Sequence, residues 1–308
     1  MRVFVTGASG WIGSAITAEL IEAGHQVVGL ARSDASAEAI TAAGAEVQRG
    51  DITDLDSLRA GAEGADGIIH TAFIHDFNAH EEAAAVDFEA VKLFGDLLEG
   101  SGRPLVIASG ILGAVSVETD RPDPATSWSP RLRTEEALLG FADRGVRSSS
   151  VRLAPSVHGD GDHGFIAALI RIDREKGSAG YVGDNRWPAV HRLDAAHLFR
   201  IALEEAPGGT VLHAIGDEGV PLREAAEVIG RHLDVPVVEI APRGCRRALR
   251  LARTHAQHRQ HRIEHHHPGE VRLGADASGP HRGPRARALL PGGVAASGVA
   301  ASGTRRQA

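Results

Sequence analysis

A glycine-rich segment near the N-terminus, TGASGWIG at 6–13, constrains the fold more than any other feature of the sequence. An apolar run that predicts a strand precedes it, and a stretch with helical periodicity follows it. In such a strand–turn–helix unit, Gly7 permits the tight turn and Gly10 lets the backbone approach a diphosphate, while Gly13 allows the helix to pack closely on the strand. The start of the helix adds unpaired N–H groups and a positive dipole end. The segment therefore predicts a dinucleotide-binding turn, with a purely structural turn as the alternative.

Predicted strands and helices alternate along the chain. Apolar runs predict strands at 2–6, 26–31, 45–48, 66–73, 103–110 and 147–153. Helical periodicity predicts helices at 11–24, 36–44, 55–64, 82–100 and 132–143. Repeated βαβ units whose strands are apolar on both faces predict an α/β fold with a doubly wound parallel sheet, the Rossmann fold. Helices at 164–177, 193–205 and 221–233, with strands at 210–215 and 236–241, predict a small C-terminal substrate lobe, and the Pro-, Ser- and Asp-rich stretch at 118–130 predicts a loop.

The composition excludes several classes of protein. No apolar stretch approaches the ~18 residues of a membrane span, so we expect no membrane partner. The first residues lack the pattern of a secretory signal, and Cys245 is the one cysteine. A single cysteine rules out a disulfide framework and favours a cytoplasmic location.

The amino-acid composition changes after Pro242. Residues 243–308 carry 13 arginines, no lysine and 3 acidic residues, a net charge of +10, which leaves −17 for the first 242. We therefore divide the chain into an NAD(P)-binding Rossmann domain with substrate-lobe elements at 1–242 and an irregular Arg-, His-, Gly- and Ala-rich tail at 243–308. The acidic body predicts that nucleic acid is not a partner. The run EHHHP at 264–268 predicts no metal site, because adjacent histidine side chains diverge.

The glycine-rich segment resembles the TGxxGxxG signature of extended and atypical short-chain dehydrogenases/reductases, the NAD(P)-dependent epimerase/dehydratase group. Further matching segments are GDITD (50–54), HTAF (70–73), IASG (107–110), VRLAPSVHG (151–159) and AVHRLDAAHLF (189–199). The resemblance spans residues 1–241 and is nearest to an atypical subgroup whose function is poorly defined. It implies a nicotinamide cofactor and a small-molecule substrate, with a homodimer left open.

The tail departs from that resemblance, since the family continues past residue 242 with an aromatic-rich segment. Reading the codons one nucleotide out of frame from about Cys245, with synonymous codons chosen freely, gives a sequence beginning AAEHFGWLAPTHSIDN. That sequence resembles the family's C-terminal lobe. We hypothesise a frameshift, in the gene or in its recorded sequence, which sequencing of the coding DNA tests.

The second predicted strand ends at Ala31, and the residues after it favour NADP over NAD. Sites specific for NAD usually place a carboxylate about 20 residues past the glycines, to bind the ribose 2′-hydroxyl. Here Arg32 follows Gly13 by 19 residues, and its guanidinium can bind a 2′-phosphate with help from Ser33. Asp34 is the counter-argument, because a shifted loop would let it reach the ribose and bind NAD.

The resemblance also implies contacts to the adenine from Asp51 and Ile52, although Asp51 could instead cap the following helix. The expected cofactor contacts are Gly7, Ser9, Gly10, Trp11, Ile12, Gly13, Arg32, Ser33, Asp51, Ile52 and Ala72.

The catalytic pair of the superfamily, Tyr-x-x-x-Lys, is missing. The chain has one tyrosine, Tyr181, and its two lysines, Lys92 and Lys176, do not have that spacing from it. Counting back from the predicted strand at 147–153 puts Ser127 and Arg131 at the two positions. The atypical subgroup has His-x-x-x-Arg there, so the arginine is retained and the histidine is not.

Three residues are our catalytic candidates. Ser109 matches the family's serine that binds the substrate oxygen, or is a plain strand-end serine. Arg131 binds the cofactor ribose or polarises a carbonyl, or is a solvated helix-start arginine, and its high pKa makes it a poor proton shuttle. His158, on the loop after the sixth strand, suits acid–base chemistry, or is a structural or solvated histidine. His191 and Asp194 resemble a segment that orders the pocket wall.

These residues predict an NADP(H)-dependent oxidoreductase or epimerase/dehydratase-like enzyme that acts on a small carbonyl or hydroxyl substrate by hydride transfer. The alternative is a catalytically silent NAD(P)-binding sensor or regulatory protein, which the missing Tyr-Lys pair favours.

Overall fold

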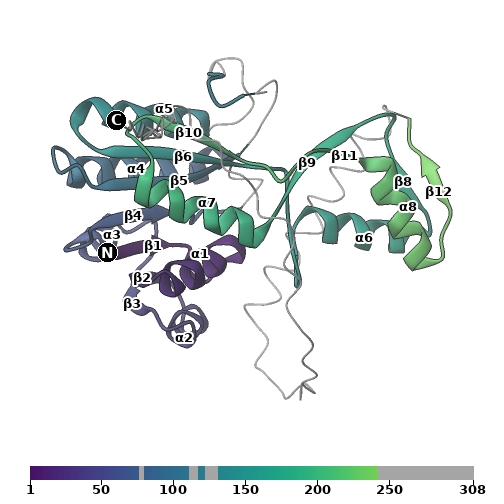
Figure 1. The fold of residues 1–308 in the computed structure, drawn as a ribbon. Helices are drawn as coiled ribbons and strands as arrows, with labels where there is room; N and C mark the ends of the chain where they lie inside the picture. The colour runs from purple at the N-terminus through teal and green to yellow at the C-terminus, as the bar shows by residue number, and fades with distance from the viewer. Residues whose placement is uncertain (76–79, 111–116, 122–130, 242–308) are drawn as a thin grey trace, which may run out of the picture.

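The computed structural model describes residues 1–75, 80–110, 117–121 and 131–241. Seven parallel strands form the main sheet in the order β10-β6-β5-β4-β1-β2-β3 (Figure 1). They are β1 (Arg2–Thr6), β2 (Gln26–Ala31), β3 (Glu46–Arg49), β4 (Gly67–His70), β5 (Pro104–Gly110), β6 (Arg147–Leu153) and β10 (Thr210–Ala214). The strand order reverses on either side of β1, so the predicted doubly wound parallel sheet is confirmed.

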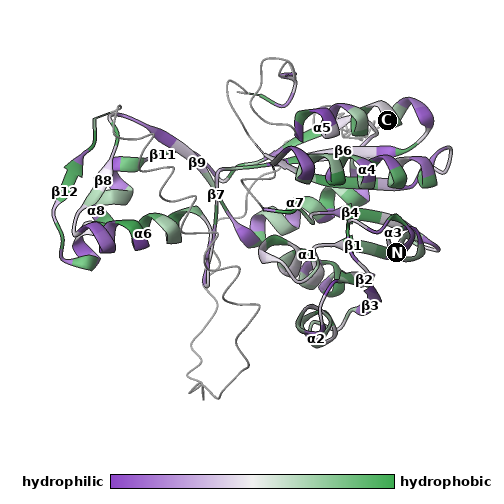
Figure 2. Cartoon of the chain, turned by 180° about the vertical axis from the view of Figure 1, so that it is seen from behind, coloured by the Kyte–Doolittle hydropathy of each residue, from purple (hydrophilic) through white to green (hydrophobic). Residues whose placement is uncertain are grey.

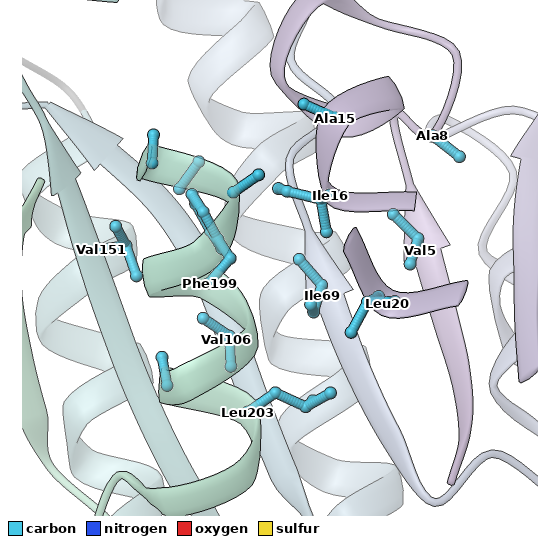
Figure 3. Close-up of a cluster of buried hydrophobic side chains, with 14 of the residues drawn as sticks. Val5, Ala8, Ala15, Ile16, Leu20, Ile69, Val106, Val151, Phe199 and Leu203 are labelled. Carbon is cyan, nitrogen blue, oxygen red and sulfur yellow. The ribbon is translucent and has the colours of Figure 1, made fainter. Parts of the chain in front are cut away.

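Helices cover both faces of this sheet. On one face lie α1 (Trp11–Glu22), α2 (Asp34–Ala42) and α7 (Arg192–Glu205), and on the other α3 (Leu55–Ala62), α4 (His80–Leu98) and α5 (Arg131–Gly140). Figure 3 shows the first core, in which Ile16 and Leu20 of α1 and Phe199 of α7 pack beside the strand residues Val106 and Val151. All five are fully buried, as strands covered on both faces require.

A smaller lobe lies beyond the carboxyl ends of the main-sheet strands (Figure 1). It contains a three-stranded sheet in the order β11-β9-β7 and a two-stranded sheet of β8 and β12. The strands are β7 (Ser156–His158), β8 (Ala179–Tyr181), β9 (Arg186–His191), β11 (Asp217–Pro221) and β12 (Val237–Glu239), and the helices are α6 (Phe165–Lys176) and α8 (Leu222–Leu233). Figure 2 shows β12 as an apolar strand, although Val237 and Val238 are exposed.

Four lobe strands, β7, β8, β9 and β11, were not predicted, because β7 and β8 have only three residues each and β9 and β11 contain proline. The prediction that His158 lies on a loop is wrong, since it is the last residue of β7 and pairs with His191 of β9. The predicted helix at 132–143 is α5 followed by a short 3₁₀ turn at Phe141–Arg144, which ends at Gly145 with φ of 73°. Residues 122–130 of the predicted loop and the tail from 242 lie outside the described residues.

None of the helices in the described ranges combines the length and the apolar character that crossing a bilayer requires.

Candidate cofactor and catalytic site

The turn between β1 and α1 is held in a shape that only glycine fits. Gly7 has φ of +72°, and its carbonyl accepts a hydrogen bond from the Gly10 N–H at 2.8 Å. A Cβ on Gly7 would lie 2.7 Å from Thr71 Oγ1, and one on Gly13 would lie 2.0 Å from the Gly7 carbonyl oxygen. A Cβ on Gly10 would lie 3.1 Å from the same oxygen. The three glycines therefore let the turn, the helix and the end of β4 approach one another closely.

The first turn of α1 fits the diphosphate of a dinucleotide. Gly10 is its N-cap, with no side-chain hydrogen bond to the helix, and the first turn carries no acidic residue. Ser9 and Gly10 are exposed, and Trp11 and Ile12 are half-buried. The N–H groups at this helix start and the positive dipole end therefore remain available to an anion.

At the end of β2 the predicted cofactor arginine is open to solvent. The Arg32 side chain is 72% exposed, and its Nε lies 4.0 Å from Oδ2 of Asp51. The Ser33 hydroxyl caps α2, where it accepts from the Ser36 N–H at 3.2 Å. Asp34, the carboxylate that argued for NAD, forms an ion pair with Arg49 at 2.7 Å. Arg32 thus has a longer ion-pair contact than Asp34 has.

Asp51 does not cap the helix that follows it, so that alternative is wrong. Its Oδ1 accepts from the backbone N–H and the hydroxyl of Thr53, at 2.9 and 2.8 Å. The cap of α3 is Asp54, whose carboxylate accepts from the N–H groups of the first turn. Ile52 is buried. Both residues follow the end of β3, and their contact with the adenine stays a prediction.

A chain of polar contacts runs from the glycine-rich turn to Arg131. The Ala72 N–H donates to Thr6 Oγ1 at 3.3 Å, and Thr6 Oγ1 lies 2.7 Å from His70 Nδ1. His70 Nε2 lies 3.2 Å from Oδ1 of Asp87 on α4. Because the carboxylate can only accept, Nε2 donates there, and in the neutral ring Nδ1 accepts from the Thr6 hydroxyl.

Arg131 completes this chain at the start of α5. Its Nη2 donates to Asp87 Oδ1 at 3.2 Å and to the Ala108 carbonyl at 2.7 Å, and its Nε donates to Asp87 Oδ2 at 3.4 Å. The guanidinium lies 4.3 Å from the centre of the Phe73 ring. With a side chain only 20% exposed, Arg131 is not a solvated helix-start arginine. Within the described residues nothing accepts a hydrogen bond from its Nη1.

The charge on Asp87 is stabilised by its neighbours. Burial alone would raise the pKa of this carboxyl, but the charge of Arg131 and the hydrogen bond from His70 outweigh burial and lower the pKa below its ordinary value. The carboxylate is therefore ionised across the neutral range. An ionised Asp87 fixes Arg131 in place by charge as well as by geometry.

Ser109 lies at the end of β5, beside a second buried ion pair. Arg152 donates from Nη2 and Nε to Glu135 at 2.6 and 3.1 Å, and the Ser150 hydroxyl donates to the same carboxylate at 2.7 Å. Burial raises the pKa of Glu135, but hydrogen bonds from Arg152, Ser150 and Ser109 lower it below its ordinary value. Ser109 thus lies near enough to Glu135 for its hydroxyl to favour the ionised carboxylate.

The structure brings Ser109 and Arg131 together but joins neither to His158 by a hydrogen bond. Arg131 bonds the carbonyl of Ala108, the residue before Ser109. His158 lies on β7 with its ring 5.5 Å from that of His191. Tyr181 lies on β8 in the lobe, under the guanidinium of Arg223. Ser127, the residue at the family's tyrosine position, lies outside the described residues.

Sequence reasoning missed the buried polar residues that hold the site, namely His70, Asp87, Glu135 and Arg152. All four are at most 3% exposed. In the sequence each is a polar residue within a helix or strand, and no pattern separates a buried charged side chain from a solvated one. His70 lies at the end of β4 and Asp87 lies on α4, and together they connect to Thr6 of the glycine-rich turn. Recognising them as a pair requires knowledge of the fold.

The fold and this site define a Rossmann protein with the glycine-rich turn and strand-end residues of the short-chain dehydrogenase/reductase type. Residues 3–100 match the model of the NAD dependent epimerase/dehydratase family. An uncharacterized protein of Schizosaccharomyces pombe is 45% identical over 251 residues, which are 78% of this chain and 83% of that protein. The chain belongs to the NAD dependent epimerase/dehydratase family, as its motifs predicted.

Two less similar proteins, a ketoreductase and an epimerase, differ from each other in activity. A farnesyl-dihydroquinoline-oxide ketoreductase of Stigmatella aurantiaca is 26% identical over 245 residues, covering 72% of this chain and 70% of that enzyme. Among solved structures, the UDP-glucose 4-epimerase of Thermus thermophilus in complex with NAD has a TM-score of 0.60 and 20% identity, over 79% of this chain and 87% of the other. The second likeness shows the fold alone.

Proposed function

We propose that the protein is an NADP(H)-dependent oxidoreductase that reduces or oxidises a small carbonyl or hydroxyl substrate. The observation that carries this proposal is the position of Arg131, which Asp87 and Ala108 hold at the end of β5 and whose Nη1 donates to no described residue. The same chain of contacts begins at the glycine-rich turn. The ketoreductase relative supports carbonyl chemistry in this fold.

The preference for NADP is supported at the end of β2. Arg32 is largely exposed and its nearest carboxylate is 4.0 Å away, so its guanidinium is available to a 2′-phosphate. Asp34 is paired with Arg49 through Oδ1, which favours an orientation toward that arginine. A bound nicotinamide would supply the hydride or accept it.

The chain's own residues would divide the remaining work. Arg131 can donate to a carbonyl oxygen of the substrate, because no described residue accepts a hydrogen bond from its Nη1. An arginine stabilises a developing oxyanion by fixed charge but does not give up its proton. We therefore keep His158 as the acid or base, although it lies on the lobe strand β7.

A catalytically silent cofactor sensor is the second candidate. The observation that favours it is the place of Tyr181, which is the chain's one tyrosine and packs in the lobe cluster with Leu169 and Ile170. A protein of this kind would bind the cofactor through the same turn and change no substrate. A cytoplasmic location and a homodimer stay predictions under either function.

The two functions are separated by following NADPH absorbance at 340 nm with a panel of aldehydes, ketones and sugar nucleotides. We expect oxidation of NADPH with at least one carbonyl and about 10²-fold slower turnover in Arg131→Met. Arg133→Met is the matched control, because Arg133 also lies over a phenylalanine ring, 4.7 Å from the centre of Phe88. Tight NADPH binding with no turnover on any compound would favour the sensor, and no binding would overturn both.

A further inference from the structure

Arg192 lies where two helices begin. It is the first residue of α7, which packs beside α1 (Figure 1). Its guanidinium lies 4.2 Å from the centre of the Trp11 ring, and its Nη2 is 3.4 Å from Ser14 Oγ. Trp11 and Ser14 both belong to the first turns of α1. A cation therefore sits beside the positive end of one helix dipole and on the positive end of another.

Nothing in the described part of the chain neutralises this cation. No carboxylate there lies within ion-pair distance of Arg192, including Asp194 in the first turn of α7. Its Nε is buried and has no hydrogen-bond partner among the described residues. A buried N–H of a charged group that lacks an acceptor destabilises the folded state. Such a placement is unfavourable unless a ligand supplies negative charge and acceptors.

The orientation of Arg192 is fixed by its surroundings. Its stem runs past Gly159, where a Cβ would lie 3.0 Å from Arg192 Cγ and 3.1 Å from Cδ. Trp11, the platform under the guanidinium, is itself held by a hydrogen bond from its Nε1 to the Val157 carbonyl at 3.0 Å. The side chain thus cannot swing freely into solvent to find a counter-ion.

We propose that Arg192 binds the diphosphate of the dinucleotide cofactor, adding a charged side chain from the start of α7 to the N–H groups of α1. The proposal rests on the proposed function in requiring a cofactor at this turn. The uncapped Gly10 and the acid-free first turn of α1 leave an anion site beside the guanidinium. The planar fork of arginine matches phosphate oxygens, and its charge strengthens those hydrogen bonds. Arg192 then contacts the cofactor as well as Trp11.

The test compares two ligands by isothermal titration calorimetry. ADP-ribose carries the diphosphate but no 2′-phosphate, and adenosine 2′-monophosphate carries the 2′-phosphate but no diphosphate. Arg192→Met keeps most of the stem's packing on Gly159 and Trp11 and removes the charge. Arg223→Met is the matched control, since Arg223 also lies over an aromatic ring, 5.5 Å from the centre of Tyr181.

We expect Arg192→Met to weaken ADP-ribose binding about 10- to 100-fold and to leave adenosine 2′-monophosphate unchanged. Arg192→Lys should retain part of the affinity, and Arg223→Met all of it. Unchanged ADP-ribose binding by Arg192→Met would overturn the proposal. Equal losses for both ligands with a lower melting temperature would also overturn it, because Arg192 would then only support Trp11. A parent protein that binds neither ligand would instead defeat the proposed function itself.

Discussion

Asp87 of α4 and Arg131 of α5 are joined at two points, with Nε 3.4 Å from Oδ2 and Nη2 3.2 Å from Oδ1. The carboxylate is 1% exposed, while the guanidinium reaches the surface. The pair therefore works as a buried anchor for a partly exposed cation. His70 binds the same carboxylate, so the loss of Asp87 would leave two polar side chains without their partner.

Asp87→Asn should destabilise the fold strongly. Removing one partner of a buried ion pair leaves the other charge uncompensated, which typically costs about 3–5 kcal/mol. Urea denaturation measures the loss in the free energy of unfolding. Asp96→Asn is the matched control on the same helix, because Asp96 is 41% exposed and pairs with Lys92 and Arg144 at the surface. We expect that control to lose no more than about 1 kcal/mol. Equal effects of the two substitutions would contradict a special role for Asp87.

Acid should weaken the fold through Asp87 and Glu135. Both carboxyls have a pKa below their ordinary values of 3.8 and 4.5 in the folded protein. A lowered pKa contributes stability that is complete above the unfolded pKa and is lost as pH falls through the folded one. The free energy of unfolding should therefore hold from pH 7 to about 5 and decline below about 4.5. In Asp87→Asn the decline should be shallower, and a decline as steep as the parent's would show that other groups cause it.

The alternation of apolar strands and helices was enough to predict the main sheet and its helices. Most of those strands, such as β1, β4 and β5, are buried on both faces, so hydrophobic pattern alone identifies them, whereas the edge strand β3 is half-buried or exposed. The lobe was predicted only in part. Strands such as β8 and β11 are short and contain glycine, and most of their residues are half-buried or exposed, so their formation depends on pairing with distant segments.

The candidate site was also predicted only in part. The glycine turn was predictable because Gly7 and Gly13 are required by backbone geometry that the spacing encodes. The partners of Arg131 and Ser109 were not, because Asp87 meets Arg131 across the contact between α4 and α5, and Glu135 meets Ser109 across the contact between α5 and β5. Placing them needs the packing of α4 and α5 on β5.

Gly13→Ala should disrupt the turn. The new Cβ would lie 2.0 Å from the Gly7 carbonyl oxygen and 2.7 Å from its carbon, so α1 must move away from β1. Overpacking of this kind costs about 1–3 kcal/mol, and cofactor binding should be lost with the turn. Gly140→Ala is the control, since a Cβ there meets nothing within 4 Å and the residue ends a helix. We expect that variant to be unchanged or up to about 1 kcal/mol more stable. Thermal melts and NADPH titration measure both effects, and an unaffected Gly13→Ala protein would rule out the close contact.

Arg32→Glu should reverse the choice of cofactor. A guanidinium bound to the 2′-phosphate contributes about 1.5–3 kcal/mol through charge-assisted bonds, whereas a carboxylate there repels the phosphate and can bind the ribose hydroxyls of NADH. Titration of the parent should give a lower Kd for NADPH than for NADH, and the variant the opposite order. Arg59→Glu on α3 makes the same change of charge at an exposed position and should keep the parent's preference. Equal affinities in the parent would mean that Arg32 does not contact the cofactor.

The last prediction concerns the proton that carbonyl reduction consumes. The hydroxyl of Ser109 is a weak acid and Arg131 does not release its proton, so another group must exchange a proton at neutral pH. His158 is the candidate at the end of β7, with His191 beside it. His158→Ala should lower turnover by about 10²- to 10⁴-fold and leave cofactor affinity unchanged.

The pH dependence of turnover distinguishes this role from a structural one. An imidazole acting as acid or base gives the rate profile a limb between about pH 5 and 8, which His158→Ala should abolish. His232→Ala, at an exposed position on α8, should keep both the rate and the limb. If His158→Ala retained the parent's profile at a reduced rate, the histidine would serve only to pack against His191 and order the lobe sheet. If it retained the rate as well, the proton would have to come from a group other than His158.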